Sequence, residues 1–460
     1  MQKQIETELN SIFESQVKIL EDLVKIPSIS FEGFDPSNIK KCADAVFELF
    51  KENNFDEVRF LGKQTNPAVF AVLKGNPNLP SVLLYAHYDV QPPMRENLWI
   101  SPAFEPQVRD GRLYGRGTAD DKAAIVVHLA AALLAKKLLG ENCPSLKFLI
   151  EGEEECGSPN IAALLKECKD LKSSVAIICD SSNWDETTPA IVSSLRGMVA
   201  LEIEVKSMEK PLHSGTWSGP IPDAAQGLSR ILASLKPPKA PPLAKNILES
   251  FAEMSKSYGY KELKKEGSLL NNTQILVKEK DILKSLWRDS TITVTAMEAG
   301  SRKNAGNVLQ NSAWARVSIR IPPGLDIKKV LEQSKKQIEA ACPWGLKLSI
   351  KTESGMATPW ETKTEHIFFK KMLDALEKGY GKKPLLTGCG ASIPMVAAIS
   401  KAFKNMPILL TGIGDPKANA HGENESVSLA VLKKAILSEI LFLSSVSITP
   451  KDSKFLNGVR

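Results

Sequence analysis

Apolar residues in the first part of the chain follow two alternating patterns. Spacings of three and four residues, starting at Ile5 and Leu9 and continuing to Leu23, predict a helix with one apolar face. Further helices are predicted at residues 39–50, 123–139 and 161–171. Short apolar runs predict strands at residues 68–73, 82–86, 146–150 and 175–179. Strands that alternate with helices are typical of a mostly parallel sheet covered on both faces.

The pattern changes near Arg196, where apolar residues begin to alternate with polar or small ones. This alternation predicts half-exposed strands at residues 199–205, 292–294 and 317–321. Helices are expected at 222–235 and 330–340, and a further strand at 346–350. We expect a smaller α+β domain with an open-faced sheet, spanning residues 196–361.

The first style returns after residue 362, with a strand predicted at 408–410 and helices at 367–376 and 427–443. The predicted fold class is therefore α/β. A mixed, mostly parallel sheet flanked by helices is formed by residues 1–195 and 362–460, and the smaller domain interrupts it.

Composition narrows the choice of function. The 460 residues are 43% hydrophobic and 24% charged, which is ordinary for a soluble protein. A net charge of +6, without a dense basic tract, argues against nucleic acid as a partner. No apolar run approaches the roughly 20 residues that span a bilayer, so no membrane partner is expected. The N-terminus lacks a signal-peptide pattern, and seven irregularly spaced cysteines favour the cytoplasm.

Acidic and imidazole side chains gather where predicted strands end. His87 and Asp89 follow the strand at 82–86, and Asp180 follows the strand at 175–179. Four glutamates follow the strand at 146–150, and His421 lies in a polar loop beyond 408–410. In open parallel sheets the carboxyl ends of the strands line the binding crevice, so these groups are expected to converge.

Converging carboxylates repel one another unless they are protonated or surround a cation. Imidazole with carboxylate suits zinc or manganese, and a shared carboxylate lets five side chains hold two metals. Each feature taken alone has a structural explanation: a run of glutamates is usually a solvated surface, and Asp120–Asp121 can begin a helix. Their occurrence in this order after successive strands favours a metal centre.

Five strings of the chain resemble the metal motifs of one family of di-zinc hydrolases. They are LLYAHYDVQPP, LYGRGTADDKAA, LIEGEEECGS, ICDSSNW and NAHGENES, and they extend from about residue 80 to 426. The family includes aminoacylase, carboxypeptidase G, acetylornithine deacetylase and the cytosolic dipeptidases. The wording HYDVQPP and the segment around SLWRDSTITV resemble its larger, carnosinase-like dipeptidase branch.

This resemblance implies a role for each matching residue. Asp120 would bridge two divalent metal ions, with zinc expected first and manganese or cobalt as alternatives. His87 and Asp180 would complete one site, and Glu155 and His421 the other. Asp89 would orient His87 from behind. Glu154, which Gly157 places in the register of the family's general base, would take a proton from a metal-bridging water and pass it to the leaving nitrogen.

The inserted domain also resembles its counterpart in the family. PLHSGTWSG resembles a lid motif whose histidine, here His213, serves the active site of the other subunit, which implies a homodimer formed through a lid and dimerisation domain. Asn307 matches a substrate-site asparagine. GCGASIP resembles the loop that binds the substrate carboxylate, with Gly390 and Ser392 at substrate-binding positions, but Gly388 stands where many dipeptidases have arginine. Asn311 likewise replaces a lid arginine.

We therefore expect a metal-dependent hydrolase of the amide bond in dipeptides or similarly small N-acyl amino acids. An N-acyl amino acid deacylase of the acetylornithine or succinyl-diaminopimelate type is the alternative. A non-catalytic binding protein on the same fold should have lost a ligand or the base, and all seven expected groups are present.

Overall fold

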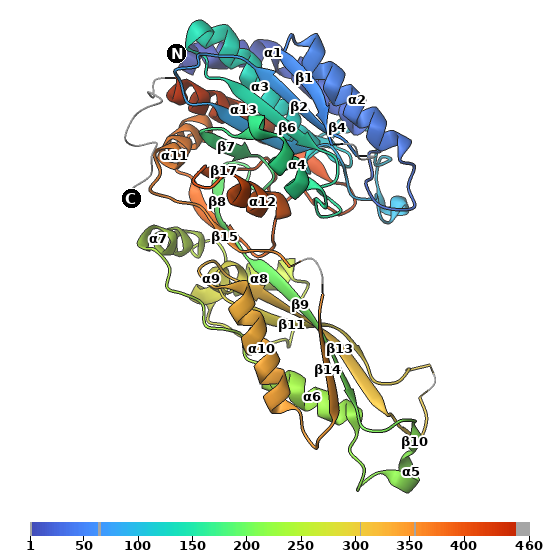
Figure 1. The fold of residues 1–460 in the computed structure, drawn as a ribbon. Coiled ribbons are helices and arrows are strands. Elements are labelled where there is room, and N and C mark those ends of the chain that lie inside the picture. Colours follow the sequence, from blue (N-terminus) through green and yellow to red (C-terminus); the bar gives the residue numbers. More distant parts are fainter. Residues whose placement is uncertain (1, 63–65, 304, 354–355, 448–460) are drawn as a thin grey trace. The chain divides into compact units, whose positions relative to one another are not determined.

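A computed structural model describes residues 2–62, 66–303, 305–353 and 356–447. The chain divides into two compact units, drawn in Figure 1. The first unit comprises Met1–Ser193, Thr362–Thr387 and Pro394–Arg460. The second comprises Ser194–Glu361 and Gly388–Ile393, so a short loop from the last part of the sequence groups with the inserted part.

The largest sheet has a parallel centre. Its order is β1-β2-β6-β3-β7-β17-β8-β15, with β16 also paired to β8. The strands are β1 (Glu57–Leu61), β2 (Ala68–Leu73), β3 (Val82–His87), β6 (Leu146–Glu151), β7 (Val175–Ile178), β8 (Ala190–Leu195), β15 (Trp360–Glu361), β16 (Leu385–Cys389) and β17 (Ile408–Leu410). β3 pairs in parallel with β6 and β7, and β17 with β7, whereas β2 and β8 run antiparallel to their neighbours. Three parallel pairings therefore bring four strand ends to one edge.

Helices cover this sheet in contiguous layers (Figure 1). The helices of the first unit are α1 (Gln2–Val24), α2 (Ser37–Glu52), α3 (Lys122–Leu139), α4 (Ile161–Glu167), α11 (Ile367–Tyr380), α12 (Pro394–Ala402) and α13 (Leu429–Val446). α13 contacts α1, α3 and α11, while α12 contacts α4. Every residue of β3 is buried, as expected for a central strand with both faces covered.

α3 corrects one statement made from the sequence. The segment Lys122–Asn142 is long and apolar enough to cross a membrane by length and composition, so the expectation that no run approaches that length was wrong. In the structure 67% of its most apolar window is buried, and α3 packs against α1, α13 and β3. A core helix that is apolar on all sides passes the same test.

One predicted helix start and one predicted helix end also differ from the structure. Residues 427 and 428 belong to β18 (Ser426–Ser428), and the helix begins only at Leu429 because the Ser428 side chain accepts a hydrogen bond from the Val431 amide. α4 ends at Glu167, followed by the separate short turn Lys169–Leu171. β18 pairs with β5 (Arg112–Tyr114), which pairs with β4 (Gln107–Arg109), in a small antiparallel sheet.

The second unit is built on an antiparallel sheet in the order β11-β13-β9-β14. These strands are β9 (Gly197–Lys206), β11 (Thr291–Glu298), β13 (Ser312–Ile321) and β14 (Lys347–Thr352). α6 (Ala224–Ser234) and α10 (Ile327–Ala341) pack on it through a core that includes Leu201 and Val317. The second unit also contains α5 (Ser214–Trp217), α7 (Lys245–Met254), α8 (Tyr260–Glu266), α9 (Ile282–Trp287), β10 (Leu212–His213) and β12 (Val308–Leu309).

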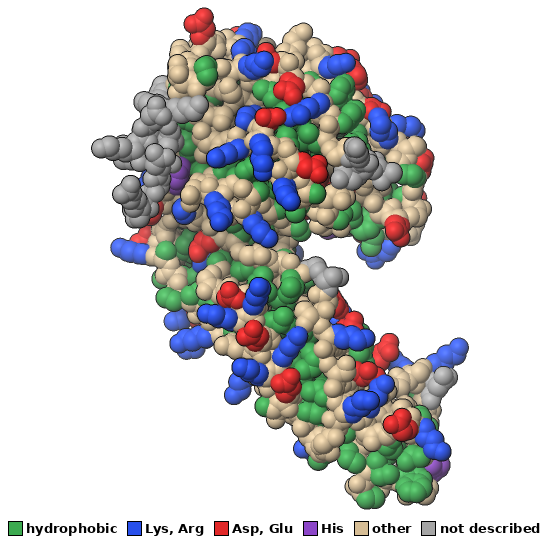
Figure 2. Space-filling model, viewed as in Figure 1, with side chains coloured by type: hydrophobic (Ala, Val, Ile, Leu, Met, Phe, Trp, Pro, Cys, Tyr) green, Lys and Arg blue, Asp and Glu red, His purple; other side chains and the backbone are tan. Residues whose placement is uncertain are grey.

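Charged side chains are mixed on the surface. Figure 2 shows lysine and arginine scattered among aspartate and glutamate on the face in view, without a single basic patch. This matches the small excess of 59 basic over 53 acidic residues in the whole chain.

Candidate metal centre

The parallel pairing of β3, β6 and β7 brings the predicted ligands to one edge of the sheet. His87 is the last residue of β3, and Asp180 lies two residues beyond the end of β7. Glu154 and Glu155 lie in the turn after β6. Asp120 precedes α3, and His421 comes from the loop between β17 and β18. All these residues belong to the first unit.

The structure arranges the five predicted ligands as two groups that share one carboxylate. His87, Asp120 and Asp180 form one group, and Asp120, Glu155 and His421 form the other, each with ligand atoms within 4.8 Å of one another. His87 Nε2 lies 3.2 Å from Asp120 Oδ1, and His421 Nε2 lies 2.9 Å from Asp120 Oδ2. The two oxygens of Asp120 therefore face the two different groups.

The donor atoms fit divalent cations. His87 is fully buried, and its Nε2 makes no hydrogen bond with the described residues although it lies beside Asp120. Burial, followed by the charge of Asp120, raises the pKa of Asp180 well above its usual value. Burial acts to raise the pKa of Asp120, but hydrogen bonds with His421 and His87 lower it by more, so the net shift is downward. Carboxylates and imidazoles held this close favour a cation among them.

Asp89 connects the two halves of the site. Its carboxylate accepts hydrogen bonds from the backbone amides of Glu154, at 3.2 Å, and Glu155, at 3.0 Å. His87 Nδ1 lies 3.1 Å from the Asp89 carbonyl oxygen and 3.4 Å from its carboxylate. Asp89 thus fixes the glutamate turn in addition to the imidazole, because a ring that donates from Nδ1 presents Nε2 as an acceptor.

Glu154 has the electrostatics of a proton acceptor near neutral pH. Burial raises its pKa to about 7, opposed by His87 and reinforced by Asp89, Glu155 and Asp120. Bound cations would lower that pKa by favouring the carboxylate. Glu153 points elsewhere, since its carboxylate accepts hydrogen bonds from the backbone and side chain of Asn160.

Three polar residues at the centre were not predicted as site residues, although Asp121 was considered as the start of a helix. Gln91 Nε2 donates to Glu155 Oε2 at 2.7 Å, and Asp121 Oδ2 lies 3.3 Å from the His87 amide. Glu425 accepts a hydrogen bond from the Asp120 amide at 3.0 Å. Gln91 and Glu425 stand inside strings that resemble family motifs, but neither follows a strand directly, so the strand-end criterion passed over them.

Four predicted substrate-site residues lie in the second unit. His213 is exposed and pairs with Val308 between β10 and β12. The neighbouring Asn307 is also exposed, and its carbonyl accepts a hydrogen bond from the Ser214 amide at 2.9 Å. The structure therefore brings His213 and Asn307 together on one exposed part of this unit.

The loop at residues 388–393 contains the other two, Gly390 and Ser392. Ser392 is half-buried, and the Gly390 carbonyl accepts a hydrogen bond from Arg196 Nε at 3.1 Å. A side chain at Gly388 would place its Cβ 2.7 Å from Cβ of Trp287, so this position has no room for the arginine that many dipeptidases carry there. Where those dipeptidases have the arginine side chain, Trp287 fills the space in this protein.

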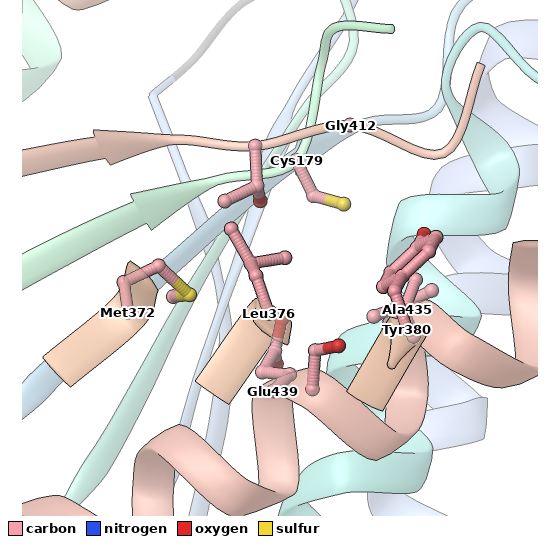
Figure 3. Close-up of a pocket in the computed structure, with 10 residues that line it drawn as sticks. Cys179, Met372, Leu376, Tyr380, Gly412, Ala435 and Glu439 are labelled. Carbon is pink, nitrogen blue, oxygen red and sulfur yellow. The ribbon is translucent and has the colours of Figure 1, made fainter. Parts of the chain in front are cut away.

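Figure 3 shows a cavity in the first unit that is separate from the ligand cluster. It is lined by groups that include Cys179, Leu376, Tyr380 and Glu439, and none of the five predicted ligands lines it. Its volume of about 10 Å³ is comparable to the space for one water molecule, so it cannot admit a substrate.

Comparison with known proteins identifies the family. Residues 83–442 match the model of peptidase family M20/M25/M40. The chain belongs to this family. It is 30% identical over 408 residues to the cysteinylglycine-S-conjugate dipeptidase of Corynebacterium striatum, covering 88% of this chain and 89% of that protein.

Two solved structures have the same fold as this M20 family member. The M20 family metallo-carboxypeptidase Sso-CP2 from Sulfolobus solfataricus matches with a TM-score of 0.77 and 25% identity, covering 94% of this chain and 99% of that one. Human carnosine dipeptidase 1 matches with a TM-score of 0.75 and 21% identity, covering 97% and 98%. The predicted α/β fold class is confirmed, and the chain is a hydrolase of the metallopeptidase class.

We predict that single ligand replacements remove different numbers of metal ions. Because Asp120 belongs to both groups, Asp120→Ala should leave less than about one ion per chain, whereas Asp180→Ala and His421→Ala should each leave about one of two. Elemental analysis after dialysis measures the stoichiometry. Glu153→Gln, a buried neighbour that bonds Asn160, is the matched control and should keep both ions. Equal losses for all three ligand variants would contradict a shared carboxylate.

Proposed function

We propose that this protein is a di-metal dipeptidase that hydrolyses the amide bond of dipeptides. The observation that carries the proposal is the sharing of Asp120 between two adjacent ligand groups. Two adjacent cation sites suit the hydrolysis of an uncharged, poorly electrophilic amide. The name of the C. striatum relative, a dipeptidase, and that of human carnosine dipeptidase 1 support a dipeptide as substrate.

The five ligands would hold two divalent ions, for which we propose zinc first and manganese or cobalt as alternatives. When bound, the ions would lower the pKa of a water molecule and polarise the scissile carbonyl. His87 and His421 would bind the ions as neutral imidazoles, and the Asp89 carbonyl, 3.1 Å from His87 Nδ1, favours the tautomer that leaves Nε2 free to bind. Fixed ligands leave less reorganisation for the moment of reaction.

Glu154 performs the proton transfers in this proposal. Its carboxylate takes a proton from the attacking water as the carbon–oxygen bond forms. It then delivers that proton to the amine nitrogen as the carbon–nitrogen bond breaks, so one residue serves as base and acid. Asp89 supports this role because it accepts a hydrogen bond from the Glu154 amide and so limits movement of the turn.

Replacement of Glu154 tests this role. We predict that Glu154→Gln lowers kcat by about 10²–10⁴-fold because the amide cannot accept the proton. Metal content should stay at the wild-type value, since Glu154 belongs to neither ligand group. Steady-state kinetics and elemental analysis on the same sample measure both quantities. A variant that keeps two metals and near wild-type kcat would exclude Glu154 as the base.

A substrate panel tests the proposed dipeptidase against its alternative. N-acyl amino acid deacylases are the second candidate, favoured by the glycine at position 388, which removes a cation that dipeptidases often present. We predict a higher kcat/KM for dipeptides than for acetylated or succinylated amino acids. Chelation should abolish the dipeptidase activity, and zinc, manganese or cobalt should restore it. A preference for the acyl amino acids would replace the proposed substrate, and inactivity on every compound with metal bound would refute the proposed reaction.

We further propose a homodimer formed through the second unit, in which His213 of one subunit stabilises the oxyanion in the site of the other. The exposure of His213 supports this role, since the residue is accessible for a function beyond its own unit.

Mixed dimers test this assignment. We predict that His213→Ala lowers kcat without changing metal content, and that dimers mixed from His213→Ala and Glu154→Gln subunits recover part of the activity, because one composite site then has both groups. Activity of refolded mixtures, compared with each variant refolded alone, is the measurement. No recovery in mixtures shown to contain both subunits would contradict action between subunits.

A further inference from the structure

We propose that Glu425 is a positioning residue that holds Asp120 in the place where it is shared by the two metal groups. The inference rests on the proposed function, because it takes Asp120 as the bridging ligand. Glu425 acts through the backbone of the turn that carries Asp120, and it is fully buried.

The Glu425 carboxylate collects four hydrogen bonds from one turn. Oε1 accepts from the Ala119 amide at 2.9 Å and the Asp120 amide at 3.0 Å. Oε2 accepts from the Gly117 amide at 3.0 Å and from Arg116 Nη1 at 2.7 Å. Backbone amides that converge in this way form an anion-binding concavity, and here a side chain of the same protein fills it.

The small antiparallel sheet delivers Glu425 to this position. β18 begins at Ser426, which pairs with Tyr114 at the end of β5, so Glu425 lies opposite the residue after that strand. The Gly115 amide donates to the Glu425 carbonyl at 2.9 Å. The Arg116 side chain is also fixed, since it is 1% exposed and its Nη2 donates to the Pro92 carbonyl at 3.1 Å. The carboxylate therefore meets the turn in a fixed orientation.

The turn requires glycine at position 117. Gly117 has a φ of 86°, which side chains rarely adopt. A Cβ there would lie 2.7 Å from Cγ1 of Val90, so the Gly117 backbone packs closely against Val90 while its amide donates to the Glu425 carboxylate. A turn with this shape directs its amides inward to Glu425, while the Asp120 side chain faces His87 and His421.

Glu425 also connects two ligands of one metal group. His421 lies in the loop that leads into Glu425, and Asp120 lies in the turn that Glu425 binds, although Glu425 and Asp120 are 305 residues apart. In glutamine one oxygen still accepts, but the NH₂ group that replaces the other oxygen faces two donors: the Ala119 and Asp120 amides, or the Gly117 amide and the Arg116 guanidinium. A buried donor without an acceptor is destabilising, so the turn would shift to find other acceptors. Because Asp120 is shared, such a shift weakens both metal sites.

The decisive measurement is the affinity of folded, metal-free protein for zinc. We expect Glu425→Gln to raise the zinc Kd of both sites at least tenfold in competition with a chromophoric chelator, with the metal-free protein still folded by circular dichroism. Glu425→Asp, which keeps the charge but shortens the reach, should show an intermediate Kd. Affinities equal to wild type in folded Glu425→Gln would overturn the proposal.

Asp415 offers a matched control. It is buried in the first unit, and its carboxylate bonds Arg112 at 2.9 Å and the Lys417 amide, neither of which is a predicted metal ligand. Asp415→Asn should lower the unfolding midpoint of the metal-free protein as Glu425→Gln does, yet keep the wild-type zinc Kd. If it weakened zinc binding equally, general destabilisation would explain both results and the positioning role would be refuted.

Three further outcomes are separable. If Glu425→Gln does not fold, the zinc Kd of Glu425→Asp decides: a raised value supports the positioning role, and a wild-type value overturns it. If wild-type protein binds none of zinc, manganese and cobalt, the proposed function itself fails. If wild type binds two ions and cleaves dipeptides while both Glu425 variants keep its affinity, only the role of Glu425 fails.

Discussion

Mutual repulsion among buried carboxylates is the constraint on which the rest of the first unit depends. Asp120, Asp180 and Glu155 converge with His87 and His421, and burial together with the charge of Asp120 raises the pKa of Asp180. Such a cluster persists where the backbone is held from outside and its charge is relieved from inside, by protonation or by a cation. The parallel centre of the sheet, the Asp89 carboxylate and the β5–β18 pair supply the external support.

The sequence predicted the centre because its ligands are tied to strong local signals. His87 and Asp180 come at the ends of short apolar runs, which are typical of central strands. These two strands, β3 and β7, are parallel neighbours, so their carboxyl ends meet at one edge of the sheet. The motif resemblance then added Asp120, which does not follow a predicted strand, and gave a role to His421, which lies in a polar loop well beyond one. Fold class and family were confirmed in this way. The roles of individual residues, the division into domains, and the homodimer stay predictions.

Other features could not be predicted from the local pattern of apolar and polar residues. Glu425 is one acidic residue in a polar loop, and only the chain's return past β5 reveals that its carboxylate meets backbone amides from another segment. α7, α8 and α9 are short helices after a proline-rich stretch, too brief for a periodic pattern to stand out. The closed space at Gly388 depends on Trp287, which is distant in sequence, so no spacing rule could have indicated it.

The position of β17 has a consequence for synthesis. β17 lies between β7 and β8 in the sheet, although the whole inserted unit separates it from them along the chain. A ribosome therefore releases β3, β6 and β7 long before the strand that completes their sheet, and before the loop with His421 exists. Contacts between segments so far apart form late and slowly. Until then, the edge of β7 is unpaired and the acidic cluster lacks its second imidazole, and an unpaired strand edge exposes an incomplete chain to aggregation.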